Sequence, residues 1–231
     1  MKFEDYEKKE KKRIEINIGY LEQGVNFVDV RTAYIDEGVV IGNGTTIYPC
    51  VTLEGNVKIG KNCVIGQNTR IVDSTIGDES EVQSSVVIES KIGNHATIGP
   101  FAHVRPNSDI GDNCKVGAFV EIKNSTMANG AKTPHLAYVG DADIGSDVNL
   151  GCGVVFVNYN GSQKFRSEVK DGAFVGCNVN IVSPVVVEEG AYIAAGSTVT
   201  KDVPADSLCI AREKQRIIKG WASKRGILKK K

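Results

Sequence analysis

The sequence predicts an all-β fold, a parallel β-helix with a short helical segment at each end. Two observations support this prediction. Aliphatic residues recur every six positions over most of the chain. The composition also suits short strands broken by frequent turns, because 25 of the 231 residues are glycine, many apolar residues are Val or Ile, and only 6% are aromatic.

The six-residue period runs from Ile35 to Val199, with a few one-residue shifts. It matches neither the 3.6-residue period of a helix nor the two-residue period of a flat strand. One short strand and one turn per unit explain it, and three units form a triangular coil of about 18 residues, which gives roughly nine coils. We expect the following side chains to point into the prism: Ile35, Ile41, Ile47, Leu53, Ile59, Ile65, Ile71, Ile76, Val82, Ile92, Ile98, Val104, Ile110, Val116, Ile122, Val139, Ile144, Leu150, Phe156, Val175, Ile181, Val187, Ile193 and Val199.

The pattern divides the chain into three parts. Residues 1–25 are rich in Glu, Lys and Arg with a few apolar positions, and we interpret them as a helical cap or linker. Such a cap is expected, because an exposed coil would recruit other strands. Residues 26–205 form the β-helix, and residues 206–231 form a basic tail with helical character. The tail is either a solvated end or an arm that meets a polyanion such as a cofactor phosphate.

Charge and cysteine content exclude several classes. Lys+Arg and Asp+Glu number 28 each, so global charge does not favour nucleic acid or a membrane surface as a partner. No run of 18 apolar residues is present. The six cysteines show no metal-like spacing, and Cys63 and Cys114 fall at small core positions. We therefore expect a reduced, cytoplasmic protein without a metal.

Two stretches depart from the period. Residues 127–138 contain His135, and the insertion at residues 158–168, NYNGSQKFRSE, contains an Asn-Gly turn and two basic residues. Irregular loops on a rigid scaffold often carry function. We expect these two stretches to contribute the site, whereas His95 and His103 lie within the regular repeat and are interpreted as ordinary.

The irregular stretches also carry a family resemblance. The run KTPHLAYVGDADIGSDVNLGCGVVFVNYNGSQKF (132–165) resembles the acetyltransferase domain of the bifunctional bacterial enzymes that make UDP-N-acetylglucosamine. GPFAHVRPNSDIG (99–111), VGAFVEIKNS (116–125) and DGAFVGCNVNIVSPVVVEEGAYIAAGSTVTKDVP (171–204) are similar to the same domain, and so are the pair Ala211-Arg212 and residues 28–55. The similarity covers about 200 residues in order, and these are hexapeptide-repeat transferases.

The resemblance implies a left-handed parallel β-helix, an exception to the usual right-handed crossover. It implies transfer of acetyl from acetyl-CoA to the amine of glucosamine-1-phosphate, in a homotrimer with each site between neighbouring prisms. The family enzymes begin with a uridylyltransferase domain opened by a glycine-rich loop, which nothing in residues 1–30 resembles. We therefore expect uridylyl transfer and its magnesium to be absent.

By the same resemblance His135 is the general base. Attack on a thioester requires a neutral amine, and an imidazole with a pKa near 6.5 can accept the proton as the C–N bond forms. No residue is an obvious acyl carrier, so we expect direct transfer.

The remaining roles also come from the resemblance. Guanidinium and ammonium groups suit a phosphate dianion. The backbone N–H of Cys152 would polarise the thioester carbonyl. Cys177 stands where some family members have Ser. The positions matching the sugar-phosphate site are Arg105, Lys123, Tyr138, Asn149 and, from a neighbouring subunit, Lys164; those matching the acetyl-CoA site are Cys152, Asn158, Tyr159, Cys177, Ala195 and Arg212.

Three other interpretations stay open. One is an acetyltransferase of the same fold with another acceptor, such as a nucleotide amino sugar. A second is a metal-dependent hydratase resembling the γ-type carbonic anhydrases, although that chemistry needs three converging histidines and this chain has three in total at unsuitable spacing. The third is a non-catalytic β-helix scaffold, against which the presence of His135 counts.

Overall fold

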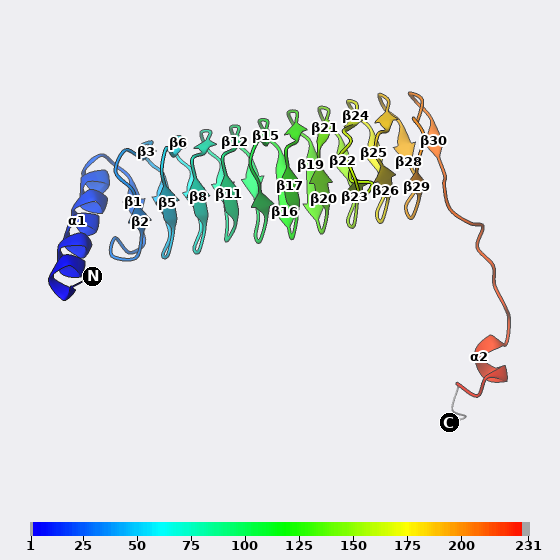
Figure 1. Cartoon of the computed structure of the whole chain (residues 1–231), viewed down its shortest axis with the longest axis horizontal. Helices are drawn as coiled ribbons and strands as arrows, with labels where there is room; N and C mark the ends of the chain where they lie inside the picture. Colours follow the sequence, from blue (N-terminus) through cyan, green and yellow to red (C-terminus); the bar gives the residue numbers. More distant parts are fainter. Residues whose placement is uncertain (1, 228–231) are drawn as a thin grey trace.

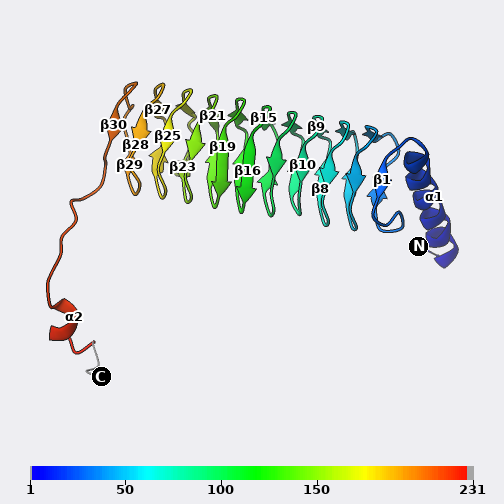
Figure 2. The same ribbon diagram turned by 180° about the vertical axis from the view of Figure 1, so that it is seen from behind.

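The computed structural model describes residues 2–227. These form a straight β-solenoid in which each coil contributes one strand to each of three parallel sheets, of eleven, ten and nine strands. Helix α1 (Phe3–Glu22) lies at one end of the stack and β30 (Leu208–Cys209) at the other (Figures 1 and 2). The parallel β-helix expected from the six-residue period is confirmed.

The eleven-stranded sheet contains, in order, β1 (Asn26–Phe27), β4 (Thr46–Ile47), β7 (Val64–Ile65), β10 (Glu81–Val82), β13 (Thr97–Ile98), β16 (Lys115–Ala118), β19 (Lys132–His135), β22 (Asn149–Leu150), β25 (Phe174–Val175), β28 (Tyr192–Ile193) and β30. The ten-stranded sheet contains β2 (Tyr34–Ile35), β5 (Thr52–Glu54), β8 (Arg70–Val72), β11 (Val86–Ile88), β14 (His103–Val104), β17 (Glu121–Lys123), β20 (Tyr138–Gly140), β23 (Val155–Val157), β26 (Asn180–Val182) and β29 (Thr198–Val199). The nine-stranded sheet contains β3 (Val40–Ile41), β6 (Lys58–Ile59), β9 (Thr75–Ile76), β12 (Lys91–Ile92), β15 (Asp109–Ile110), β18 (Thr126–Met127), β21 (Ala142–Ile144), β24 (Ser167–Val169) and β27 (Val186–Val187).

The six-residue aliphatic positions form the core. Ile47, Ile65 and Phe156 are completely buried, and every other position of the series is also buried. Cys63 and Cys114 are buried beside them, as expected. Successive side chains of a strand point to opposite faces of the sheet. The buried aliphatic residue of each strand therefore determines which of its neighbours face outward.

The one-residue shifts of the period are coils shortened by one residue in a turn. Val40 pairs with Lys58, 18 residues on, whereas Lys58 pairs with Thr75, only 17 residues on. The strands therefore stay in register although the sequence phase shifts, and outward positions line up from coil to coil.

Helix α1 covers the first coil, as predicted. Asn17 of this helix is buried and donates to the carbonyls of Val30 and Ala33, at 2.8 and 3.0 Å. Arg13 donates to the same Ala33 carbonyl at 2.7 Å, and Tyr20 Oη donates to the Val39 carbonyl. These bonds satisfy backbone carbonyls to which the N–H groups of a preceding coil would otherwise donate.

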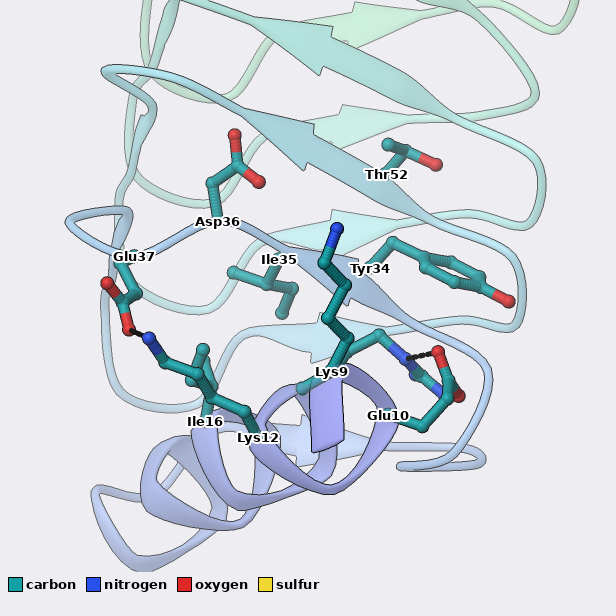
Figure 3. A pocket seen from close by; sticks show the side chains of 10 residues that line it. Lys9, Glu10, Lys12, Ile16, Tyr34, Ile35, Asp36, Glu37 and Thr52 are labelled. Atoms are coloured by element: carbon teal, nitrogen blue, oxygen red, sulfur yellow. Dashed lines mark hydrogen bonds and ion pairs between the residues drawn. The ribbon is translucent and has the colours of Figure 1, made fainter. Parts of the chain in front are cut away.

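A cavity of about 540 Å³ lies between α1 and the first coils (Figure 3). Lys12 of the helix pairs with Glu37 across it, and Glu10 pairs with Arg13 at 2.6 Å. None of the residues predicted for the site lines this cavity.

The tail leaves the stack after β30 and extends away from it (Figure 1). Its helical part is the single turn α2 (Trp221–Lys224), which buries none of its residues. Three of the basic residues that characterise the tail, Lys229, Lys230 and Lys231, lie outside the described residues.

Candidate functional site

Two corners of the prism border the ten-stranded sheet, and the predicted site residues divide between them. The first, here called the histidine corner, joins the eleven-stranded to the ten-stranded sheet. Its successive turns contain Phe101, Phe119, Leu136, Gly153, Asn178 and Gly196. The second, here called the aspartate corner, joins the ten-stranded to the nine-stranded sheet and contains residues 105–108, 123–125, 140–141 and the insertion at 158–166.

His135 ends β19 at the histidine corner, where it pairs with Ala118 of the preceding coil. The imidazole is exposed, and no side chain among residues 2–227 hydrogen-bonds to it. Gly117 makes this placement possible, since a Cβ there would lie 1.8 Å from the Pro134 carbonyl oxygen. The histidine is therefore positioned by backbone packing and left free to react.

Two predicted cofactor residues follow His135 directly along this corner. Lys132 pairs with Asn149, and Asn149 pairs with Phe174 of the next coil. Three residues further along each coil, the same register places Cys152 beside His135 and Cys177 beside Cys152. Backbone bonds of 2.8 Å, Asn178 N to Cys152 O and Gly196 N to Cys177 O, hold these turns together.

The two residues at the far end of this corner complete the column. Ala195 lies beside Cys177 by the register Phe174↔Tyr192, and it is exposed. Arg212 packs against Gly196, where its Cδ would lie 3.7 Å from an added Cβ. The corner thus presents one predicted residue per coil from His135 to Ala195, with a guanidinium at its end.

The backbone N–H of Cys152 lies in a turn and donates to no acceptor among residues 2–227. The neighbouring N–H groups of Gly151 and Gly153 are both bonded, to the carbonyls of Val175 and Leu136. An unpaired donor at a partly exposed turn can bind an oxygen of a ligand.

The aspartate corner brings three cations around one pocket of about 380 Å³. Arg105, Lys123 and Lys164 line this pocket together with Asn124 and Asp141. Lys164 lines this pocket from the same chain as Arg105 and Lys123, and its contribution to the site of a neighbouring subunit stays a prediction. The ammonium of Lys123 lowers the pKa of Lys164, as expected for two like charges that share a site.

Two carboxylates offset part of this charge. Arg105 NH1 bonds Glu121 Oε1 at 2.7 Å in a half-exposed pair. Lys123 Nζ lies 3.2 and 3.3 Å from the two oxygens of Asp141, and both side chains are largely buried. Burial lowers the pKa of Lys123, but the bonds and charges of its neighbours, Asp141 foremost, together raise it above the usual value, so Lys123 stays an ammonium ion.

Tyr138 stands on the ten-stranded sheet between the two corners. Its ring lies over Gly140, where an added Cβ would be 2.4 Å from Tyr138 Oη. Asn158 Nδ2 donates to that phenol oxygen at 3.4 Å and also bonds Asp141. The structure therefore places Asn158, predicted for acetyl-CoA, with the sugar-phosphate residues of its own chain.

The insertion forms a small hairpin on the aspartate corner. Tyr159 pairs with Lys164, and Asn160 Oδ1 accepts backbone bonds of 2.9 Å from Ser162 and Gln163 in the loop between them. Arg166 holds the base of the hairpin through 2.5 Å bonds to Asp143. Because the insertion is folded and anchored, Lys164 has a defined place.

Asn149, like Tyr138, lies on a sheet and not at a corner. It begins β22 on the eleven-stranded sheet, beside Lys132 of the preceding coil. Sequence reasoning missed Asp141, Asn124 and Arg166. The motif GDA marked the segment, but a six-residue period does not distinguish a buried acid in a turn from a solvated one.

We also looked for side chains that could bind a metal ion. Among residues 2–227 no group of three or more His, Cys, Asp or Glu side chains could hold a metal ion. No helix of the same residues is both long and apolar enough to cross a membrane.

Three family descriptions match parts of the chain. They are Bacterial transferase hexapeptide (six repeats) at residues 89–124, GMPPB C-terminal domain at residues 30–105, and Hexapeptide repeat of succinyl-transferase at residues 169–201.

Relatives of known name match over almost the whole chain. The Bifunctional protein GlmU of Clostridioides difficile (strain 630) is 52% identical over 213 residues, 92% of this chain and 46% of that protein. The Bifunctional protein GlmU of Clostridium botulinum (strain ATCC 19397 / Type A) is 48% identical over 218 residues, 94% of this chain and 48% of that protein. The chain thus spans about half the length of these curated relatives.

Solved structures are less similar. UDP-N-acetylglucosamine acyltransferase of Francisella novicida is 23% identical, covers 78% of this chain and 65% of its own, and gives a TM-score of 0.41. The family assignment therefore depends on the repeat matches and on the relatives above. The chain belongs to the hexapeptide-repeat transferases and is the counterpart of about half of a bifunctional GlmU protein.

Proposed function

We propose that this chain is an N-acetyltransferase that moves acetyl from acetyl-CoA to the amine of glucosamine-1-phosphate. The observation that carries the proposal is the pocket of Arg105, Lys123 and Lys164 at the aspartate corner. His135 lies at the histidine corner, on the other side of the ten-stranded sheet. One small, anionic sugar can span such a sheet. The relatives' identity over most of the chain supports the same activity.

The reaction proceeds by direct attack. The sugar nitrogen bonds the thioester carbonyl carbon, the C–S bond breaks, and coenzyme A leaves as the thiol. His135 accepts the proton lost by the amine and returns it to the leaving sulfur. The exposed imidazole, which no side chain of residues 2–227 engages, suits that exchange.

The phosphate of the acceptor binds the three cations of the aspartate corner. Guanidinium and ammonium donors form charge-assisted bonds to phosphate oxygens. Tyr138, fixed over Gly140, then contacts the sugar ring. Asn149 is proposed to contact the sugar as well, from the neighbouring sheet.

Acetyl-CoA lies along the histidine corner in this proposal. The unpaired N–H of Cys152 polarises the thioester carbonyl and stabilises the oxyanion that forms on attack. Cys177 and Ala195 line the path of the cofactor, and Arg212 meets its phosphates. Neither cysteine acts as a nucleophile, and no metal takes part.

A homotrimer is part of the proposal. Asn158 and Tyr159 lie on the aspartate corner of the chain, whereas Cys152, Cys177 and Ala195 lie on the histidine corner. If all five contact one acetyl-CoA, the two corners must come from neighbouring copies. Sedimentation equilibrium tests this, and a monomer with full activity would contradict it.

The test of function is coenzyme A release, read by free thiol, with glucosamine-1-phosphate, glucosamine and UDP-glucosamine compared side by side. We expect turnover with glucosamine-1-phosphate alone. Turnover confined to UDP-glucosamine would assign another acceptor, and no release from folded protein would reject acetyl transfer to these sugars.

A further inference from the structure

Asp141 is a buried acid in the turn after β20. It is 6% exposed and has a left-handed backbone, with φ of 52°. Its own backbone is fixed, because its N–H donates to the Lys123 carbonyl at 2.9 Å and its carbonyl accepts from Ser167 N at 3.1 Å. The carboxylate is therefore held in one place by the prism.

Three donors from two separate segments converge on this carboxylate. Lys123 Nζ approaches both oxygens, and Asn124 Nδ2 donates to Oδ1 at 2.6 Å. Asn158 Nδ2, at the start of the inserted hairpin, donates to Oδ2. Lys123 and Asn124 come from the coil before Asp141, and Asn158 comes from the coil after it.

The contacts link two functional groups that are otherwise separate. Lys123 faces the phosphate pocket, while Asn158 also bonds Tyr138 Oη and begins the hairpin that carries Lys164. The other charged groups around the pocket are Arg105 and Glu121. No other carboxylate among the described residues pairs with Lys123.

We propose that Asp141 is a positioning residue that fixes Lys123 and the hairpin at Asn158 in the geometry that binds the acceptor's phosphate. This inference rests on the proposed function for the identity of the acceptor. It adds a role that neither the six-residue period nor the sugar-phosphate contacts assign.

Two explanations of Asp141 predict opposite results. If the carboxylate only offsets charge, D141N adds one positive charge to the pocket and should tighten phosphate binding. If it positions Lys123 and Asn158, D141N presents an amide NH₂ to groups that are all donors, and binding should weaken despite the added charge.

The experiment compares D141N with D147N. Asp147 lies in the same coil, has a similar φ of 56°, and is exposed. We expect D141N to raise KM for glucosamine-1-phosphate about tenfold or more, the value of one lost charge-assisted bond, with a smaller change in kcat. We expect D147N to match the wild type.

Binding of inorganic phosphate, followed by NMR of the lysine ammonium groups, gives a readout that does not need turnover. We expect the wild type to show a protected Lys123 ammonium that responds to phosphate, and D141N to lose both properties. Tighter phosphate binding by D141N, or an unchanged Lys123 signal, would overturn the proposal. A wild type that binds phosphate without turning over glucosamine-1-phosphate would reject the proposed function and leave this inference standing.

N124A serves as a second variant in case D141N does not fold. It removes one donor to Asp141 without changing charge, so an electrostatic role predicts no change in phosphate affinity. Positioning predicts a loss of roughly two- to tenfold, the range for one hydrogen bond. An unchanged affinity in folded N124A would count against the proposal.

Discussion

The two corners of the ten-stranded sheet are built on opposite principles. At the aspartate corner, Lys123 and the amides of Asn124 and Asn158 donate to Asp141 in a mostly buried network. At the histidine corner, His135 is exposed, and its neighbours along the corner are Phe101, Phe119 and Leu136, each 58–60% exposed.

Both corners use left-handed backbone, but with different residue types, and at the aspartate corner these positions are Asn107, Asn124 and Asp141. Phe101, Phe119 and Leu136 have φ of 60, 57 and 43°, a region that bulky residues rarely occupy, and after His135 the corner continues with Gly153 and Gly196. The comparison teaches that the side chains proposed to bind phosphate are organised in advance by hydrogen bonds, whereas the histidine proposed to exchange a proton is held by its backbone alone.

H135A should have the largest effect on activity. Loss of a general base reduces kcat about 10²- to 10⁴-fold. KM for glucosamine-1-phosphate should change little, because the phosphate pocket lies at the other corner. Thiol release measures both constants, and H95A, at an exposed histidine of the regular repeat, is the control. Full activity in H135A would remove the histidine corner from the mechanism.

G117A tests whether backbone packing positions the histidine. The added Cβ would lie 1.8 Å from the Pro134 carbonyl oxygen, so β16 and β19 must separate. We expect a loss of about 3 kcal/mol in the free energy of unfolding, near the upper end for overpacking. Urea unfolding measures it. G19A in α1, where nothing lies within 4 Å of the added Cβ, should stabilise instead.

K123M acts on the other corner and should change binding rather than chemistry. We expect KM for glucosamine-1-phosphate to rise about 10- to 100-fold, because one charge-assisted bond to phosphate is lost. KM for acetyl-CoA should stay within about twofold of the wild type, a value within the usual scatter of surface changes. If K123M raised only the KM for acetyl-CoA, the aspartate corner would bind acetyl-CoA and not the acceptor's phosphate.

Acid should weaken the aspartate corner selectively. Burial raises the pKa of Asp141, but the bonds from Asn124, Lys123 and Asn158 lower it more, so it lies below the usual 3.8. The ionised carboxylate therefore stabilises the fold above pH 3.8, and this contribution is lost as the pH falls through the lower, folded-state pKa.

We expect D141N to be about 2 kcal/mol less stable than the wild type at pH 6, the range for hydrogen bonds to a charged group. The difference should shrink well below pH 3.8. Urea unfolding of both proteins at several pH values measures it, and a difference that persists unchanged in acid would show that the charge contributes nothing.

C177S should have the smallest effect. A hydroxyl donates a better hydrogen bond than a thiol, but Cys177 is exposed, so water competes for the bond. We expect KM for acetyl-CoA to fall about two- to threefold, the lower end for one net hydrogen bond. Thiol release at varied acetyl-CoA measures it, and a loss of activity would indicate a role for the sulfur itself.

The sequence predicted most of the solenoid, because its strands depend on a repeated local pattern. Every inward position from Ile35 to Val199 is buried, and α1 covers the first coil. The tail was less predictable: of its residues up to 227, only Trp221–Lys224 are helical, and this turn buries none of its residues against the prism.

Site residues were predictable where a motif carried them and not where contacts between coils create them. Asp141 meets Lys123 and Asn158 only after two coils stack, and Asn158 joins the sugar-phosphate group for the same reason. Within one chain the hairpin brings Lys164 to the same pocket, and its contact with a neighbouring subunit stays a prediction.

The stacking of coils also spaces the residues of the histidine corner at regular distances. His135, Cys152, Cys177 and Ala195 belong to four successive coils, so at the strand spacing of about 4.8 Å the first and last are separated by roughly 14 Å. The inserted hairpin lengthens one coil to 25 residues without altering this spacing, because the extra residues project from a turn. The number of residues in a coil can therefore vary, while the distance between residues along this corner changes only by whole coil spacings.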